Sequence, residues 1–350
     1  AQGAGCGKYL AQWMLYGDSE LNMTGFDPRR FGVFADEAYM KAKGFQDYQM
    51  TYFTPLPGEE LPAARDIRTS PLHQRLKQQG AVHTQTFGWE RPKWFAPEGE
   101  EENYSFRHNN TFDSVREECR AVRERVGLLD LSGFAKYEVS GPDAGGFLDR
   151  ICANRMPRKT GGIVLAHILS NAGRIRAEMT VTRLAENRYY LLSAAAAELR
   201  DLDHLQQGLL PGEQVEISNI SDQLGVLVLA GPRARDALQP LTDTPLDSKS
   251  FPWHSGREIT VAGVPLIALR VNYVGELGWE LHAPMEHLPA LYDALWEQGE
   301  PCGIANFGLY AVNSLRMEKG YRGWGAELTN EVTMLDADME RFIRFDKPDF

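Results

Sequence analysis

Hydrophobic and polar residues alternate most regularly along residues 175–182. One side of this segment carries Ile175, Ala177, Met179 and Val181, and the other side carries Arg176, Glu178, Thr180 and Thr182. A period of two predicts a strand with one buried face. Shorter signals of the same kind predict strands at 136–139, 188–193 and 224–229, and a hairpin over 259–273 that turns at Ala262-Gly263.

Apolar residues at helical spacing predict helices at 1–16, 35–43, 143–153, 196–209, 286–298 and 307–319. Another helix is expected to begin at the capping box Ser114-x-x-Glu117 and to end at Gly127, and Pro232 suits the first turn of a short helix. Residues 54–99 are rich in proline, glycine and charge, which predicts an irregular connector whose aromatic cluster at 87–95 packs on a neighbour. Strands and helices alternate without a strict βαβ rhythm, so the expected fold class is α+β with antiparallel sheets.

Composition narrows the classes of function. The chain has 350 residues, of which 43% are hydrophobic and 24% charged, as in ordinary globular proteins of two or three domains. Lys and Arg total 37 against 48 for Asp and Glu, and the net charge of -11 with no basic stripe argues against a nucleic-acid partner. No apolar run is long enough to predict a membrane span. The four cysteines lie far apart, which suits a reducing compartment and argues against a disulfide framework.

Both ends of the chain lead to one expectation. The first residues run directly into an apolar helical pattern, and the last residues contain no closing element. We expect the chain to be a piece of a longer polypeptide, and the intact mass of the source protein tests this hypothesis.

Two carboxylates are candidates for chemistry. Glu178 lies on the polar side of its strand, either on a solvated outer face or lining a cavity where it accepts a proton. Glu280 ends the aromatic, glycine-containing segment 273–280. It is either the edge glutamate of a twisted hairpin or an acceptor for two parallel N–H donors of a flat heterocycle, with Tyr273 supplying ring contact. The eight histidines are scattered, so no metal site is expected.

A glycine-rich turn opens the first predicted helix. Gly3, Gly5 and Gly7 lie in this turn. Because helix N-termini favour negative charge, the turn suits a phosphate or an electron-rich flavin ring. The alternative is a simple flexible start, since the strand that normally precedes such a turn is absent from the sequence.

Several motifs, in their order along the chain, resemble one family. They are Gly5-Cys6-Gly7-Lys8-Tyr9-Leu10, Phe26-Asp27-Pro28-Arg29-Arg30-Phe31, Gly88-Trp89-Glu90-Arg91-Pro92, Asp130-Leu131-Ser132, Leu229-Ala230-Gly231-Pro232 and Asn313-Ser314-Leu315-Arg316-Met317-Glu318-Lys319-Gly320-Tyr321-Arg322. Together they resemble the dimethylglycine/sarcosine dehydrogenase family, in which an FAD-dependent amine oxidase domain precedes a folate domain like the glycine-cleavage T-protein (aminomethyltransferase). The resemblance implies an FAD-domain tail at 1–33, a connector at 34–110 and a T-protein-like folate-binding domain at 111–350 without its C-terminal β-barrel.

The resemblance also implies site residues. Glu178 stands where the T-protein has its catalytic Asp, while Tyr190, Tyr273 and Glu280 stand at folate-contacting positions, the last two at the pterin. Gly3, Gly5 and Gly7 would form the rim of the FAD site. The sequence departs from the T-protein pattern in three places: Ala177-Glu178 replaces paired Asp residues, Val312 replaces a folate-contacting Arg, and Leu165 replaces a Tyr.

The implied activity is oxidative N-demethylation. FAD, bound mostly by a part of the same or a partner chain outside this sequence, would oxidise a small N-methyl amine, and tetrahydrofolate would take up the one-carbon unit as 5,10-methylenetetrahydrofolate. The expected location is the cytoplasm, or the mitochondrial matrix in a eukaryote. One alternative is a folate-dependent aminomethyltransferase or demethylase without flavin chemistry. Another is a non-catalytic folate-binding protein of the iron–sulfur maturation type, although Tyr321 replaces the Cys of that signature. Which amine is used stays open.

Overall fold

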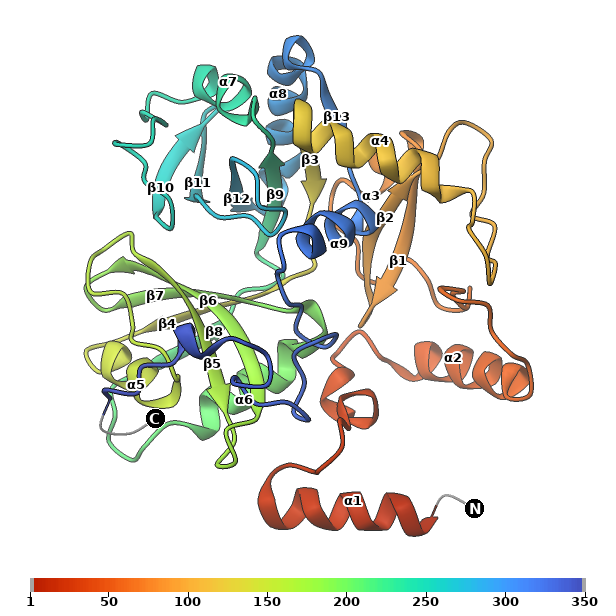
Figure 1. Ribbon diagram of the computed structural model, residues 1–350, viewed down its shortest axis with the longest axis vertical. Coiled ribbons are helices and arrows are strands. Elements are labelled where there is room, and N and C mark those ends of the chain that lie inside the picture. The colour runs from red at the N-terminus through yellow and green to blue at the C-terminus, as the bar shows by residue number, and fades with distance from the viewer. Residues whose placement is uncertain (1–2, 348–350) are drawn as a thin grey trace. The chain divides into compact units, whose positions relative to one another are not determined.

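The computed structural model describes residues 3–347, which form two compact units (Figure 1). Unit 1 takes in residues 3–30, 135–219 and 322–347, and unit 2 takes in residues 31–134 and 220–321. Each unit is therefore assembled from segments that lie far apart in the sequence.

Unit 1 is built on a five-stranded antiparallel sheet (Figure 1). Its strands, in spatial order, are β5 (Ile163–Leu169), β6 (Ile175–Ala185), β7 (Arg188–Ser193), β4 (Ala135–Ser140) and β8 (Glu216–Asn219). Its helices are α1 (Gly3–Tyr16), α5 (Ala144–Ile151) and α6 (Glu198–Gln207), and its short 3-10 turns are η1 (Thr24–Phe26), η2 (Pro28–Arg30), η3 (Ala195–Ala197) and η7 (Glu340–Phe342).

The two faces of this sheet differ in chemistry. One face is apolar, and side chains such as Met179 and Val181 of β6 pack there against α5 and α6 in one core cluster. The opposite face carries the polar members of the alternating pattern, because successive side chains of a strand point to opposite sides. Part of that face lies against the segment that contains η7, which forms a second small core with Leu165, the residue opposite Thr180 in the β5–β6 register.

Unit 2 contains a six-stranded sheet and a separate hairpin. The sheet order is β10 (Gly256–Val261), β11 (Val264–Leu269), β12 (Gly278–Pro284), β9 (Leu224–Ala230), β3 (Val126–Asp130) and β13 (Ile304–Asn306), in which only the β13–β3 pair is parallel. The hairpin consists of β1 (Ala81–Thr86) and β2 (Trp89–Phe95). The helices of unit 2 are α2 (Glu37–Met50), α3 (His73–Gln78), α4 (Thr111–Glu124), α7 (Ala234–Leu238), α8 (Leu288–Gly299) and α9 (Leu309–Glu318). Its short 3-10 turns are η4 (Gln239–Leu241), η5 (Met285–His287) and η6 (Glu300–Cys302).

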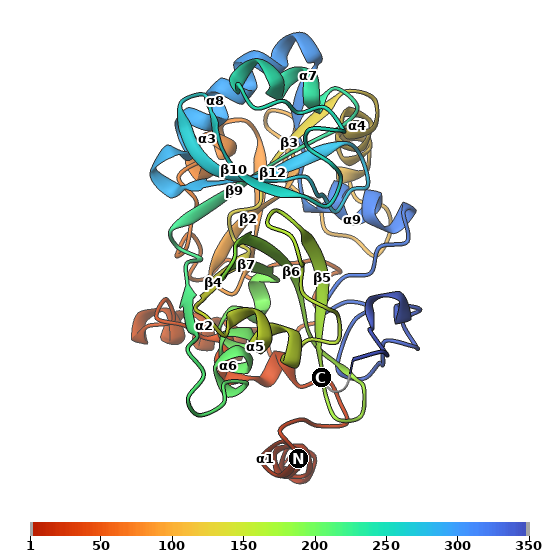
Figure 2. The same cartoon turned by 90° about the vertical axis from the view of Figure 1, so that its left-hand side faces the viewer.

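Helices cover both faces of the six-stranded sheet (Figure 2). One core cluster joins residues of α3, α7 and α8 to side chains such as Leu229 and Leu281. The other joins α4 and α9 to Val226 and Val228. Because Val228 is in register with Glu280, that glutamate belongs to the face covered by α4 and α9.

Much of the predicted pattern is confirmed. The α+β class with mainly antiparallel sheets is correct, and so is the alternation of β6, in which residues 175, 177, 179 and 181 are buried in the core. The predicted hairpin turns at Ala262-Gly263, where both residues adopt positive φ angles of 49° and 79°. The first helix is confirmed from Gly3 to Tyr16, and its predicted first two residues lie outside the described residues.

Some expectations about local structure are wrong. The segment 54–99, predicted to be an irregular connector, contains α3 and the β1–β2 hairpin. Trp89 and Trp94 are buried and provide apolar packing that the many charged residues of this segment made hard to predict. The helix predicted from Ser114 begins earlier, at Thr111, so Ser114 is an interior residue. Gly127 does not end that helix but lies in β3, where a Cβ atom would come within 2.7 Å of the Phe307 ring.

Candidate functional site

Glu280 occupies the middle of the unit 2 sheet. Its strand, β12, pairs with β11 on one side and β9 on the other, which excludes the edge-glutamate interpretation. The residue is only 7% exposed, so its carboxylate does not point into bulk water. β12 begins at Gly278, where a Cβ atom would lie 2.5 Å from the Leu229 carbonyl oxygen. Glycine at this position therefore lets β12 approach β9 closely just before Glu280.

The Glu280 carboxylate is incompletely satisfied by protein groups. Its Oε2 atom is buried without a hydrogen-bond partner among the described residues, and the nearest basic atom is His282 Nε2 at 3.4 Å. A buried carboxylate oxygen without a donor is energetically costly, and such an atom in a folded protein calls for an explanation such as a ligand or an ordered water. The atom suits a ligand that presents N–H groups.

Tyr273 lies in a loop before β12, not in the strand that the sequence predicted. The loop is held by Asn272, whose Oδ1 accepts a hydrogen bond from the backbone N–H of Gly275 at 2.8 Å. Gly275 has a φ angle of 73°, a left-handed conformation that glycine adopts without strain. Tyr273 is 38% exposed, and its ring stacks on Tyr321 with ring centroids 6.1 Å apart. It therefore keeps an accessible aromatic surface.

Glu178 is paired with a histidine that the sequence reasoning did not select. In the β5–β6 register His167 lies directly opposite Glu178, and His167 Nε2 is 2.9 Å from Glu178 Oε2. His167 is fully buried, whereas the Glu178 side chain is 17% exposed. The only sequence signal for His167 is a lone histidine inside the apolar run 163–169, where no strand was predicted.

The polar face of the unit 1 sheet is not a solvated outer face. Tyr190 and Thr182 lie opposite each other on β7 and β6, and both are completely buried. The Thr182 hydroxyl has no hydrogen-bond partner among the described residues. Glu178 is on the same face, four residues along β6 from Thr182, which corresponds to roughly 13 Å. A polar face that is partly buried and carries an unsatisfied hydroxyl is typical of a site that meets a polar ligand or water.

The predicted site residues divide between the units. Glu178 and Tyr190 belong to unit 1, and Tyr273 and Glu280 belong to unit 2. Gly3, Gly5 and Gly7 lie in the first turns of α1, which has no acidic residue in its first turn and buries none of its side chains. A Cβ atom at any of these glycines would meet nothing within 4 Å, so the start of α1 is open to another group.

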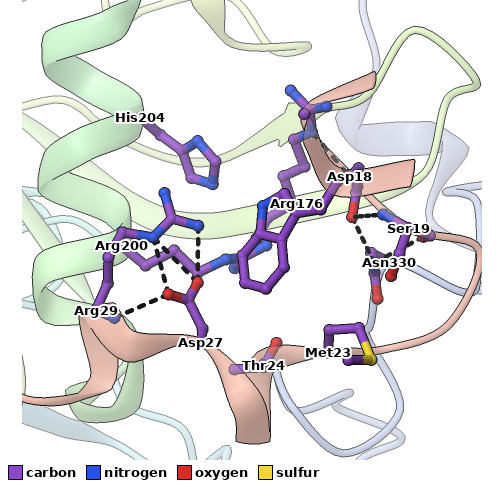
Figure 3. Close-up of a pocket in the computed structure, with 12 residues that line it drawn as sticks. Asp18, Ser19, Met23, Thr24, Asp27, Arg29, Arg176, Arg200, His204 and Asn330 are labelled. Carbon is purple, nitrogen blue, oxygen red and sulfur yellow. Dashed lines mark hydrogen bonds and ion pairs between the residues drawn. The ribbon is translucent and has the colours of Figure 1, made fainter. Parts of the chain in front are cut away.

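A small polar cavity lies in unit 1 between the segment after α1, β6 and α6 (Figure 3). Arg29 donates to Asp27 at 2.7 Å and also pairs with Asp203. Across the cavity, Asn330 donates to Asp18 at 2.7 Å. The cavity volume is about 20 Å³, room for about one water molecule. The cavity is therefore too small for a cofactor, and its charged side chains join the segment after α1 to β6 and α6. We call it the charged junction.

Burial sets the protonation of the histidine at this junction. Burial, helped by the nearby guanidinium groups of Arg200 and Arg29, lowers the pKa of His204 to about 3. His204 is therefore neutral at physiological pH, and the positive charge of the junction comes from arginine side chains.

A second hollow, of about 480 Å³, lies in unit 2 beside α4 and includes Glu118 and Asn306. None of the predicted folate residues lines either hollow. Within residues 3–347, no helix combines the length and hydrophobicity that crossing a membrane requires. Nor do three or more metal-binding side chains gather in this described part of the chain.

Comparison with known proteins gives the family. The model of the GCVT N-terminal domain matches residues 72–347, and the model of the FAD dependent oxidoreductase central domain matches residues 16–70. The solved aminomethyltransferase T of the glycine cleavage system from Bartonella henselae superposes with a TM-score of 0.67 at 25% identity, covering 80% of this chain and 70% of that protein. The architecture is thus a T-protein-like fold preceded by part of a flavin oxidoreductase.

Related proteins of known name identify the family within this class. Human mitochondrial dimethylglycine dehydrogenase is 39% identical over 348 residues, which cover 98% of this chain and 40% of the human protein. Human mitochondrial sarcosine dehydrogenase is 31% identical over 388 residues, covering 99% of this chain and 42% of that protein. The chain therefore belongs to the dimethylglycine and sarcosine dehydrogenase family, and it spans about 40% of the length of these relatives.

Proposed function

We propose that the chain is the folate-binding part of an FAD- and tetrahydrofolate-dependent N-methyl amine dehydrogenase. A small amine of the dimethylglycine or sarcosine type would be oxidatively demethylated, and its one-carbon unit would leave as 5,10-methylenetetrahydrofolate. The observation that carries this proposal is the Glu280 carboxylate, which is buried in mid-sheet with one oxygen lacking a hydrogen-bond donor. A reduced pterin presents a ring N–H and an amino group side by side, which is the donor pair that such a carboxylate lacks.

The family resemblance supplies the remaining folate contacts of this proposal. Glu280 accepts hydrogen bonds from the pterin edge, and the accessible ring of Tyr273 packs against the pterin face. Tyr190 contributes a further contact to folate. Glu178 takes up the proton that a folate nitrogen releases as it forms its new bond to carbon, and its carboxylate stabilises the cationic intermediate. The 17% exposure of its side chain supports a group that a ligand can reach.

The flavin is proposed to be held mostly by residues outside this chain. FAD would supply the two-electron oxidation of the amine. Gly3, Gly5 and Gly7 would contribute the N-terminal end of α1, whose free N–H groups favour an electron-rich partner. The domain boundaries near residues 33 and 110 and a location in the cytoplasm or mitochondrial matrix stay predictions of the same proposal.

Product partitioning tests the catalytic role of Glu178. In the protein expressed from its complete gene, Glu178→Gln should lower the rate of 5,10-methylenetetrahydrofolate formation by about 10²–10⁴-fold. Amine oxidation should continue, and the one-carbon unit should appear as formaldehyde. Glu186→Gln, a change in the turn between β6 and β7, is the control. An unchanged folate product in Glu178→Gln would refute the assigned role.

Flavin absorbance separates this function from its alternatives. Addition of dimethylglycine, sarcosine or other N-methyl amines to the same protein should bleach the flavin, and the panel identifies the preferred amine. Folate-dependent demethylation with no bleaching would favour an aminomethyltransferase or demethylase without flavin chemistry. Folate binding without any turnover would favour a non-catalytic folate-binding protein.

A further inference from the structure

His167, which is not one of the predicted site residues, contacts the proposed catalytic residue Glu178. The two residues face each other across β5 and β6, with 2.9 Å between His167 Nε2 and Glu178 Oε2. This is the one hydrogen bond that the Glu178 carboxylate makes among the described residues. Opposite residues of an antiparallel pair have closely spaced Cβ atoms, so the sheet itself holds the two side chains together.

The surroundings of His167 define which ring nitrogen donates to Glu178. Its ring is fully buried, and Nδ1 has no hydrogen-bond partner among the described residues. An ionised carboxylate accepts only, so Nε2 must carry the proton that lies between the two groups. Nε2 is therefore the ring nitrogen that donates to Glu178.

Packing fixes the direction of that donor. The His167 ring lies 6.0 Å from the Phe342 ring of η7, on the face where Leu165 joins the small core formed by the C-terminal segment of unit 1. A ring enclosed on this side cannot rotate freely. The Nε2–H group is thus aimed at Glu178 before any ligand binds.

Glu178 needs such a restraint more than a shorter side chain would. A glutamate has one more rotatable bond than an aspartate, so its carboxylate samples more positions and loses more entropy when it is fixed. Misplacement of a reacting group by about 1 Å can cost roughly a hundredfold in rate. A donor on the neighbouring strand removes this freedom by holding Oε2 and leaving the rest of the carboxylate accessible.

We propose that His167 is the positioning residue for Glu178, orienting the carboxylate that takes up the folate proton. This proposal rests on the proposed function and assigns His167 no direct contact with folate. Its role depends on one N–H group at the position of Nε2, which distinguishes it from a histidine that merely fills the core.

Three substitutions of His167 test that requirement in the protein expressed from its complete gene. The glutamine of His167→Gln can place an amide N–H near the position of Nε2, whereas His167→Asn is too short and His167→Phe keeps a ring without a donor. We expect His167→Asn and His167→Phe to slow 5,10-methylenetetrahydrofolate formation by about 10- to 100-fold. The Km for tetrahydrofolate should change little, and His167→Gln should recover most of the rate.

A double-mutant cycle separates positioning from a structural role. Adding His167→Asn to Glu178→Gln should cause no further loss of folate product, because His167 acts only through the carboxylate. The control is Ile168→Val, a neighbouring change on β5 that trims the core and should lower the melting temperature without changing the product ratio. Additive losses in the double variant, or product loss that follows melting temperature across all variants, would overturn the proposal.

The outcomes also separate this proposal from the proposed function. If Glu178→Gln loses the folate product and all three His167 variants keep it, the positioning role is wrong and the function of Glu178 stands. If Glu178→Gln keeps the folate product, the assigned role of Glu178 is wrong, and the role of His167 is overturned with it.

Discussion

The two units each place a glutamate on an inner strand of a sheet but surround it differently. In unit 1, Glu178 receives a hydrogen bond from His167, and its side chain is 17% exposed. In unit 2, the Glu280 side chain is only 9% exposed, yet its Oε2 atom lacks a hydrogen-bond partner among the described residues. A carboxylate that the protein already holds is oriented before a ligand arrives, whereas an unsatisfied one gains its donor from the ligand. The first arrangement suits proton transfer, and the second suits binding.

Each unit also contains a buried acid with no assigned role in folate binding. Burial raises the pKa of Asp201 in unit 1 to about 7, and burial raises the pKa of Glu118 in unit 2 to about 7. Asp201 accepts a hydrogen bond from the Ser193 hydroxyl. Glu118 accepts backbone N–H bonds from Phe95 and Gly308, each at 2.8 Å, and so ties β2 to the start of α9. These two buried acids hold parts of the fold together, whereas Glu178 and Glu280 are the carboxylates proposed to meet folate.

The largest expected effect is on tetrahydrofolate binding by Glu280→Gln. The amide keeps the size of the side chain but replaces a charged acceptor with a neutral group, so a charge-assisted pair to the pterin is lost. We expect the Kd measured by calorimetry with this chain to rise about 10³-fold, equivalent to about 4 kcal/mol. Glu286→Gln, at an exposed position of the same unit, is the control and should bind normally.

The melting temperature of Glu280→Gln tests the contrast between Glu280 and Glu178. If Glu280 is kept for binding, Glu280→Gln removes an unsatisfied buried charge and should leave the melting temperature of the free chain equal or higher. A lower melting temperature together with unchanged folate affinity would mean that the carboxylate is structural, and the contrast with Glu178 would disappear.

The next effect is a pH dependence of stability that arises from the buried acids. The unfolded carboxyl groups ionise near their ordinary pKa of about 4, whereas the folded ones ionise near 7. Between these values the folded protein binds more protons, so rising pH favours unfolding. Each acid should cost up to about 3–4 kcal/mol of stability between pH 4 and pH 8.

Substituting Glu118 or Asp201 separates the contributions of unit 2 and unit 1 to this pH dependence. Glu118→Gln and Asp201→Asn should each flatten this pH dependence, and hydrogen exchange of peptides from unit 2 and unit 1, respectively, should register the change. The exposed neighbour Glu117→Gln is the control. A wild-type slope in Glu118→Gln would show that this carboxyl group ionises normally in the folded protein.

The sequence was most informative where the pattern is local. The alternation along β6 put Glu178 on the correct face, because a period of two determines which side chains share a side. The choice of Glu280 came from neighbouring residues and from a family resemblance, and the structure shows that this residue is buried. Its place in mid-sheet could not be read from the sequence, because strand order is set by contacts between distant segments.

The features that sequence reasoning missed depend on long-range pairing. His167 lies in a run that reads as generic apolar core, and only the β5–β6 register brings it opposite Glu178. The β1–β2 hairpin was hidden by Pro92 and by charged residues such as Glu90 and Lys93. Those charges are buried because Arg65 pairs with Glu90 and Glu102 pairs with Lys93. Charge is a reliable sign of exposure only when its partner is not supplied from elsewhere in the fold.

The smallest expected effect concerns Tyr273, which tests how much of the affinity for folate depends on ring contact rather than on Glu280. Tyr273→Leu should weaken tetrahydrofolate binding by about fivefold, or about 1 kcal/mol, because an aliphatic side chain cannot stack on the pterin. Tyr273→Phe keeps the ring and should bind within about twofold of the unsubstituted chain. Tyr52→Leu, at a position 95% exposed in the same unit, should have no effect. Equal losses in the Leu and Phe variants would assign the contact to the hydroxyl group instead, and the division between a charged anchor and an apolar platform in unit 2 would be wrong.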